Sequence, residues 1–261
     1  DKSNIMNKLI VVSNHAKNVF ESTEYTLIND KTKQEIPFVL KTPVDVVNYP
    51  VKKFEDLPEV ELDLSTKNNF LCISQFGPRK NLPNLIKWFV EEFENDDVGL
   101  IVKTNVSKNS LIDKQASEMH IRKVLQGVSK ERKCKIYLLH GDMTDEEIHS
   151  LYLHKDIDAF VSLTHGEGFG LPIFEAAYSG MPVVTVGWSG QNDYLFDQSG
   201  KEHFYNVAFD MQPIQEEAVW DGVLQKDSMW SYARKDSAKQ QMRNCLNDVI
   251  NNNTCLLYTS P

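Results

Sequence analysis

The sequence predicts an α/β fold with a doubly wound parallel sheet, and three observations lead to this prediction. Short apolar runs of about five residues recur from residue 70 onward. Amphipathic or capped helical segments separate these runs. The runs are continuously apolar rather than alternating, which is typical of parallel strands covered by helices on both faces. The connections between such strands should be right-handed.

The elements of this sheet follow one another in a regular order. Strands are expected at residues 70–74, 99–103, 135–139, 159–163 and 182–186. Helices are expected at residues 82–93, 111–128, 145–154 and 171–179. Thr144 and Glu147 form a capping box for the third helix. One more strand is expected within residues 202–214, and residues 227–251 are predicted to form one long helix with Trp230 near its start.

The first part of the chain is predicted to be a separate unit. Strand-like runs occur at 8–12, 36–40 and 44–47, and Ser13 is a suitable N-cap for a helix that ends near Ser22. We expect residues 1–50 to be the remnant of another domain, 51–69 a linker with two prolines, 70–251 the main domain and 252–261 a tail without native structure.

Composition excludes several classes of function. The formal net charge is −9, so a nucleic-acid partner is not expected. The four cysteines form no CxxC pair, which argues against zinc or a disulfide framework and favours a reducing, cytoplasmic compartment. There is no signal peptide and no run of about 18 apolar residues, so we expect no membrane span.

A glycine-rich loop is the first candidate site. Residues 164–170 leave the carboxyl end of a predicted strand and lead into a helix, and open parallel sheets bind ligands at that edge. Unpaired N–H groups at a helix N-terminus attract anions, and Gly168 and Gly170 would let the backbone approach a phosphate closely. The alternative is a turn whose glycines only permit unusual φ angles.

Two carboxylates flank this loop. Glu175 lies among apolar residues one turn into the helix, where a charge needs a partner or a ligand, and a vicinal diol suits a carboxylate. Glu167 at the loop tip could accept hydrogen bonds from further hydroxyls. The alternatives are a helix-dipole partner for Glu175 and a solvated charge for Glu167.

Arg79 and Lys80 follow the first strand of the sheet and should therefore reach the same edge. A planar guanidinium and a compact ammonium are a suitable combination for two phosphates. The alternative is a pair of solvated loop cations. His165, just before the glycine loop, is expected to be a hydrogen-bonded scaffold rather than a catalyst.

Residues 167–175, Glu-Gly-Phe-Gly-Leu-Pro-Ile-Phe-Glu, resemble the Glu-x7-Glu signature of retaining glycosyltransferases of the GT-B type, most similar to family 4. The segment 176–195 also resembles the stretch that follows in that family, and the likeness covers roughly residues 70–195. The resemblance implies a Rossmann-like domain that forms the C-terminal, donor-binding half of a GT-B fold.

The resemblance also implies roles for the residues. Glu175 would hold the ribose hydroxyls and Glu167 the donor sugar, while Arg79 and Lys80 would grip the diphosphate. The remaining contacts are expected from the backbone of Gly168, Phe169, Gly170 and Leu171, from Gly141, Asp142 and Met143 near the base, and from Lys103 and Thr104. The chain departs from the family in two ways: Arg79 and Lys80 are adjacent, and "LIVKTN" replaces a glycine-rich turn.

The expected activity is sugar transfer from a UDP- or GDP-sugar to an unknown glycan, lipid or small-molecule acceptor, with retention of configuration. The resemblance implies that the leaving phosphate takes the acceptor's proton, so no protein base is nominated. No essential metal is expected, because no suitable Asp-x-Asp occurs. With the acceptor side mostly missing, the chain is expected to bind donor but to turn over poorly.

Three other functions are alternatives to sugar transfer. A nicotinamide dehydrogenase is disfavoured because the loop reads G-x-G-x-G rather than G-x-G-x-x-G. Product analysis would distinguish an epimerase or phosphorylase on the same fold from a glycosyltransferase. A non-catalytic nucleotide-sugar sensor would bind donor without transfer.

Overall fold

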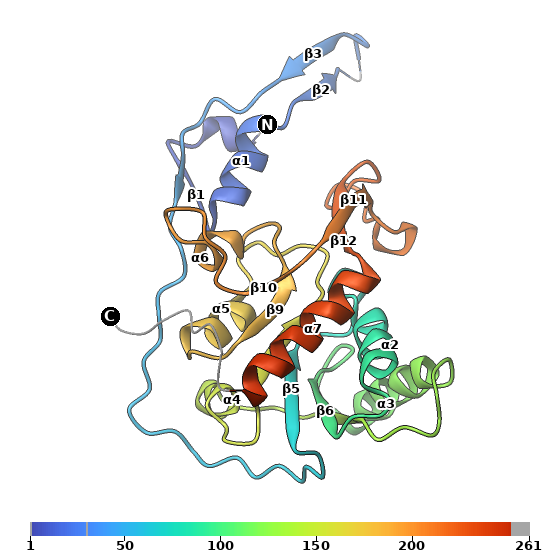
Figure 1. The fold of residues 1–261 in the computed structure, drawn as a ribbon. Coiled ribbons are helices and arrows are strands. Elements are labelled where there is room, and N and C mark those ends of the chain that lie inside the picture. The colour runs from blue at the N-terminus through green and yellow to red at the C-terminus, as the bar shows by residue number, and fades with distance from the viewer. Residues whose placement is uncertain (1, 30, 252–261) are drawn as a thin grey trace.

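The described part of the chain, residues 2–29 and 31–251 of a computed structural model, is built around a six-stranded parallel sheet (Figure 1). Its strand order is β10-β9-β8-β5-β6-β7. The bounds are β5 Asn68–Ile73, β6 Val98–Lys103, β7 Lys135–Leu139, β8 Ala159–Ser162, β9 Val183–Val186 and β10 Tyr205–Val207. The predicted doubly wound α/β fold is confirmed.

Helices cover both faces of this sheet, as continuously apolar strands require. Their bounds are α2 Leu82–Phe93, α3 Leu111–Leu125, α4 Asp145–Tyr152, α5 Leu171–Tyr178, α6 Asn192–Leu195 and α7 Lys235–Ile250. Alternate side chains of β5 pack against the helices on opposite faces of the sheet. Phe70 and Cys72 pack with α2, α3 and α7, whereas Leu71 packs with α4, α5 and α6.

The helix termini follow the chemistry of the sequence. Thr144 accepts a hydrogen bond from the Glu147 amide, and the Glu147 side chain accepts one from the Thr144 amide, which completes the predicted capping box. Gly170 has φ +87 at the N-cap of α5. This left-handed conformation favours glycine.

Residues 2–29 and 31–50 form a smaller unit beside the sheet (Figure 1). Strands β1 Leu9–Val11 and β4 Val44–Val46 pair in parallel, and Ser13 caps α1 Asn14–Ser22 as predicted. Strands β2 Tyr25–Ile28 and β3 Glu35–Phe38 form an antiparallel hairpin that projects away from the sheet. The sequence pattern did not predict β2.

The prediction of one helix over residues 227–251 was wrong. Residues Met229–Ala233 form strand β12, which pairs with β11 Phe209–Pro213, and the helix α7 starts only at Lys235. Trp230 therefore lies in a strand and is buried. The hairpin β11–β12 stands outside the six-stranded sheet, between β10 and α7 in the chain.

Two further predictions concern the linker and the tail of the chain. Residues 51–67 contain no helix or strand, and β5 begins at Asn68, one residue before the end of the predicted linker. The predicted tail, 252–261, lies outside the described residues. Among the residues that the structure describes, no helix is both long and apolar enough to cross a membrane.

Candidate donor-binding site

Two loops meet at the carboxyl edge of the sheet because their strands are neighbours. Strand β5 leads to the turn Pro78–Lys80, and the adjacent strand β8 leads to Glu167. The backbone joins the loops directly, since the His165 amide donates to the Arg79 carbonyl at 2.8 Å. Of the four charged residues expected to share a cleft at this edge, Arg79, Lys80 and Glu167 are therefore brought together, whereas Glu175 is not part of their cluster.

The Glu167 carboxylate is held by both predicted cations. Lys80 Nζ lies 2.5 Å from Oε1 and Arg79 Nη1 lies 2.8 Å from Oε2. The Thr164 hydroxyl donates a third hydrogen bond, 2.9 Å, to Oε1. Burial raises the pKa of Glu167, but Lys80 and Arg79 outweigh it and the pKa lies below its usual value. Glu167 is therefore an ionised, positioned carboxylate.

A second loop, which sequence reasoning missed, fixes the backbone of Glu167. The Ser189 hydroxyl accepts from the Glu167 amide at 2.8 Å, and the Gly190 amide donates to the Glu167 carbonyl at 2.9 Å. Ser189 has φ +78, an unfavourable conformation for a residue with a side chain. A Cβ on Gly190 would lie 2.1 Å from the Gly168 carbonyl oxygen, so only glycine permits this approach.

The glycine loop presents unpaired donors. Within the described residues, the backbone amides of Gly168, Phe169, Gly170 and Leu171 donate no hydrogen bond. The carbonyls of Phe169 and Gly170 are turned away toward the Tyr194 hydroxyl, which donates to them at 3.0 and 2.9 Å. The loop thus combines free N–H groups with the positive end of the α5 dipole, as anion sites do.

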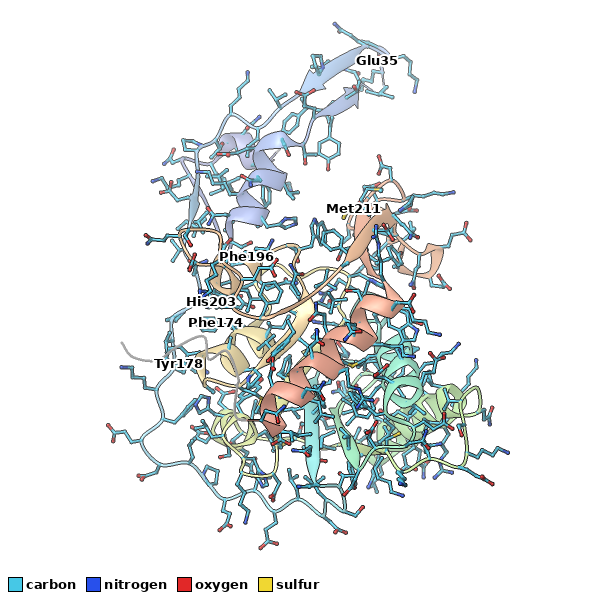
Figure 2. All side chains as sticks on the ribbon, in the orientation of Figure 1. Glu35, Phe174, Tyr178, Phe196, His203 and Met211 are labelled. Atoms are coloured by element: carbon cyan, nitrogen blue, oxygen red, sulfur yellow. The ribbon has the colours of Figure 1, made fainter. Side chains whose placement is uncertain are left out.

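Glu175 lies in a neighbouring cavity of about 300 Å³ rather than in the Glu167 cluster. The Tyr152 hydroxyl donates to Glu175 at 3.1 Å, and burial raises the pKa of Glu175 above its usual value. The cavity has aromatic walls and a cation, Lys52, which pairs with Asp145. Its lining comprises Tyr49, Pro50, Val51, Lys52, Phe54, Asp145, His149, Leu171, Phe174, Glu175 and Tyr178. Figure 2 shows Phe174 and Tyr178 on α5.

The two acids are connected through the loop between them. Tyr194 lies within electrostatic range of both Glu167 and Glu175, and its buried hydroxyl has a raised pKa. The ring of Phe169 packs against Tyr49 and Phe174 of the Glu175 cavity, at centroid distances of 5.3 and 5.2 Å. Glu167 instead lines a separate cavity of about 330 Å³.

The other predicted contacts lie farther along the sheet edge and line neither cavity. Lys103 donates to the Gly141 carbonyl at 2.6 Å, and burial lowers the Lys103 pKa. Thr104 is buried, and Asp142 accepts a hydrogen bond from Asn109. Met143 packs against the core on the α4–α5 face.

His165 has the contacts of a structural residue. Its Nδ1 lies 2.8 Å from the Ser231 carbonyl, and its ring packs against Trp230 and Tyr232 of β12. In the other direction, the Ser231 amide and hydroxyl each donate to the His165 carbonyl at 3.0 Å. His165 thereby attaches the β11–β12 hairpin to the glycine loop.

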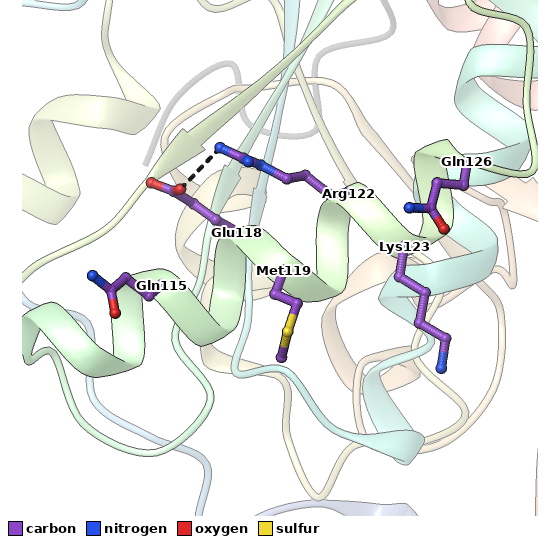
Figure 3. Close-up of a pocket in the computed structure, with 6 residues that line it drawn as sticks. All are labelled: Gln115, Glu118, Met119, Arg122, Lys123 and Gln126. Carbon is purple, nitrogen blue, oxygen red and sulfur yellow. Dashed lines mark hydrogen bonds and ion pairs between the residues drawn. The ribbon is translucent and has the colours of Figure 1, made fainter.

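A larger hollow, of about 580 Å³, is not a candidate site. Figure 3 shows its six lining residues, which lie along α3 and at its C-terminal cap, Gln126. One helix alone does not surround a ligand, and an ion pair between Arg122 and Glu118 is the interaction drawn there. Across the described ranges, no three His, Cys, Asp or Glu side chains are arranged to hold a metal ion.

The fold and the strand-edge cluster define a Rossmann-like domain of the GT-B type, and comparison with known proteins gives the family. The sequence profile described as "Glycosyl transferases group 1" matches residues 53–205. The chain belongs to this glycosyltransferase family. No curated protein matches the sequence.

Solved structures share the fold at low sequence identity. Sucrose-phosphate synthase from Thermosynechococcus elongatus is 14% identical, with a TM-score of 0.57, over 97% of this chain and 52% of that one. TarM is 18% identical, with a TM-score of 0.52, over 96% of this chain and 39% of that one. The chain therefore spans about half or less of the length of these two proteins.

Proposed function

We propose that residues 70–251 bind a UDP- or GDP-sugar and serve a glycosyltransferase that retains the anomeric configuration. One observation supports this most strongly. A positioned carboxylate, two cations and four unpaired amides lie at one edge of a parallel sheet, at the ends of the neighbouring strands β5 and β8. This combination suits a ligand that has both hydroxyls and a diphosphate.

The diphosphate is assigned to Arg79, Lys80 and the amides of residues 168–171. Arg79 is 41% exposed and uses only Nη1 in its contacts with Glu167 and Gly166, so its other N–H groups remain for a phosphate. When the bond between sugar and diphosphate breaks, the leaving group gains negative charge. Cations and a helix N-terminus aimed at that charge stabilise the transition state.

The hydroxyl-bearing parts of the donor are assigned to the two acids. Glu175 would accept hydrogen bonds from the ribose diol in the aromatic cavity, and Glu167 would accept them from the sugar ring. The leaving phosphate would take the acceptor's proton, so no side chain is required as a base. We propose that no metal is essential, and UDP affinity unchanged by EDTA is the expected result.

Calorimetric titration with UDP and GDP tests donor binding. Glu175→Ala and Lys80→Ala are expected to lower the affinity at least tenfold, because each removes a charged partner of the nucleotide. Lys87→Ala, at an exposed position of the adjacent helix α2, is the matched control and should leave it unchanged. Unchanged affinity in Glu175→Ala would remove the ribose role.

The activity of the whole protein is a separate proposal, since this chain spans only part of its structural relatives. We expect donor binding without efficient transfer from the chain as given. Proton NMR of the product anomer, made by the complete protein, tests retention. A cytoplasmic location is also proposed, supported by the buried free thiols of Cys72, Cys134 and Cys245.

A further inference from the structure

Tyr194 is a buried residue that contacts the glycine loop where the unpaired amides lie. It belongs to the short helix α6, which lies beside α5 (Figure 1). Its ring packs against Phe169 and Phe174, each at a centroid distance of 5.1 Å. Its hydroxyl lies 3.0 Å from the Phe169 carbonyl oxygen and 2.9 Å from that of Gly170. Because Tyr194 lines neither of the two cavities of the site, it acts on a ligand through the loop.

The two carbonyls determine where the amides that follow them point. In a planar trans peptide, the C=O and the N–H of one unit point in opposite directions. The Phe169 carbonyl is fixed toward Tyr194, so the Gly170 amide points away from Tyr194. The Gly170 carbonyl directs the Leu171 amide in the same way. These are two of the four amides that donate no hydrogen bond within the described residues.

The orientation of the Gly170 amide needs an external partner because Gly170 is conformationally free. Gly170 has φ +87, and glycine adopts negative φ values about as readily as positive ones. The Gly170 carbonyl has a second partner, since it also accepts from the Phe174 amide at 2.9 Å. Among the described residues, the Phe169 carbonyl accepts a hydrogen bond from Tyr194 alone. The Gly170 amide therefore depends on Tyr194 more than the Leu171 amide does.

The Tyr194 hydroxyl is a lasting donor. Burial raises the pKa of Tyr194 above its usual value, and the Glu167 and Glu175 carboxylates raise it further, so the hydroxyl keeps its proton at neutral pH. Without this hydroxyl the Phe169 carbonyl would be buried and unpaired, which is costly. A rotation of the peptide that turns this carbonyl toward water would remove that cost. The same rotation would turn the Gly170 amide away from its present direction.

We propose that Tyr194 is a positioning residue for the diphosphate of the donor. It holds the Gly170 and Leu171 amides in the direction that an anion requires, and it contacts no part of the ligand itself. Arg79 and Lys80, in contrast, act on the diphosphate through their own charge. The assignment rests on the proposed function, because these amides are binding groups only if the loop takes a diphosphate.

Tyr194→Phe tests this role, because it removes the hydroxyl and keeps the ring. UDP affinity is measured by calorimetric titration, and uridine and inorganic pyrophosphate are measured by competition against UDP. The variant should bind UDP and pyrophosphate roughly tenfold more weakly, as expected when hydrogen bonds to a charged group are lost. Uridine has no phosphate, so its affinity should stay unchanged. A general loosening of the fold would instead weaken uridine and pyrophosphate alike.

Two variants serve as comparisons. Tyr232→Phe also removes a hydroxyl that donates to a backbone carbonyl, that of Pro213 at 3.0 Å, but on the β11–β12 hairpin. This matched control should leave the affinities for UDP, uridine and pyrophosphate unchanged. Glu175→Ala should show the pattern opposite to that of Tyr194→Phe, because the proposed ribose partner is lost while the amides stay in place. Its uridine affinity should fall and its pyrophosphate affinity should be kept.

An NMR titration of the unmutated protein tests the same role without a substitution. With ¹⁵N-labelled glycine and leucine, the Gly170 and Leu171 amide resonances should shift on adding pyrophosphate and stay in place on adding uridine. If UDP binds but the Gly170 amide does not respond to pyrophosphate, the role of Tyr194 is overturned and the donor site stands. Unchanged pyrophosphate affinity in Tyr194→Phe, or equal losses for uridine and pyrophosphate, would also overturn it. If the unmutated protein binds no UDP, the proposed function fails and the assignment of Tyr194 fails with it.

Discussion

Replacing Lys80 by methionine tests the central ion-pair cluster. The substitution keeps most of the side-chain volume and removes the cation that lies 2.5 Å from Glu167 Oε1. The two side chains are only 19% and 11% exposed, so the charge left behind is poorly solvated. Loss of one partner of a buried pair costs about 3–5 kcal/mol. Arg79 and Thr164 still bind the carboxylate, so we expect a loss of about 1–3 kcal/mol.

Urea unfolding at several pH values is the assay. Because the folded-state pKa of Glu167 lies below its usual 4.5, its stabilising contribution is present above that value and is lost as the pH falls through the lower folded pKa. Lys80→Met raises the Glu167 pKa. The difference from wild type should therefore be largest near neutral pH and should narrow as Glu167 is protonated.

Two further variants decide whether the effect arises from this pair. Lys87→Met, on the exposed face of α2, should change stability by less than about 0.5 kcal/mol. In the double variant with Glu167→Gln, most of the cost of Lys80→Met should disappear. A cost below about 0.5 kcal/mol that does not vary with pH would refute the assignment of Glu167 as a buried anion stabilised by Lys80.

Three other outcomes are expected. Gly190→Ala should destabilise the fold by about 1–3 kcal/mol in thermal unfolding, because its Cβ would collide with the Gly168 carbonyl, whereas Gly127→Ala, with no atom nearer than 3.6 Å, should be tolerated. As the pH is lowered, UDP affinity should begin to fall at a higher pH in the unmutated protein than in Glu175→Gln. The reason is that Glu175 has a raised pKa, and its protonation removes the carboxylate that accepts the ribose hydrogen bonds. Identical pH profiles of the two proteins would contradict this. Thr144→Ala should cost about 1 kcal/mol by removing the α4 cap, and an unchanged urea midpoint would show that the cap is dispensable.

The strands and helices of the sheet were predictable because their signals are local. Strand β7 has the predicted bounds, and α2 begins and ends at the predicted residues. Each five-residue apolar run fits a strand covered on both faces, and each cap specifies its own helix terminus. Strand β12 was missed because its structure depends on pairing with β11, about twenty residues earlier, and on contacts with His165. The polar stretch 234–251 has a helical pattern, and the prediction wrongly began that helix before Trp230.

The candidate site was predictable to the extent that sheet topology alone places it. Residues that follow parallel strands reach one edge, so Arg79, Lys80 and Glu167 could be expected to lie together. Their pairing with one another, and the cavity that Glu175 occupies apart from them, depend on side-chain packing. No sequence motif predicts the contacts of Ser189 and Gly190 with the backbone of Glu167, because these contacts arise where one backbone segment approaches another.

The sequence by itself determined the class of this protein: the order of strands and helices, the glycine loop with its two carboxylates, and the cations at the same edge. These features depend on hydrophobic period, capping and chain order, which act over a few residues. Only the tertiary structure decided how Glu167 is neutralised, that Glu175 has a cavity of its own, and that α1 and the β11–β12 hairpin form the walls beside Glu167. Those arrangements join residues up to about two hundred positions apart, and only the packed chain brings their side chains within contact distance.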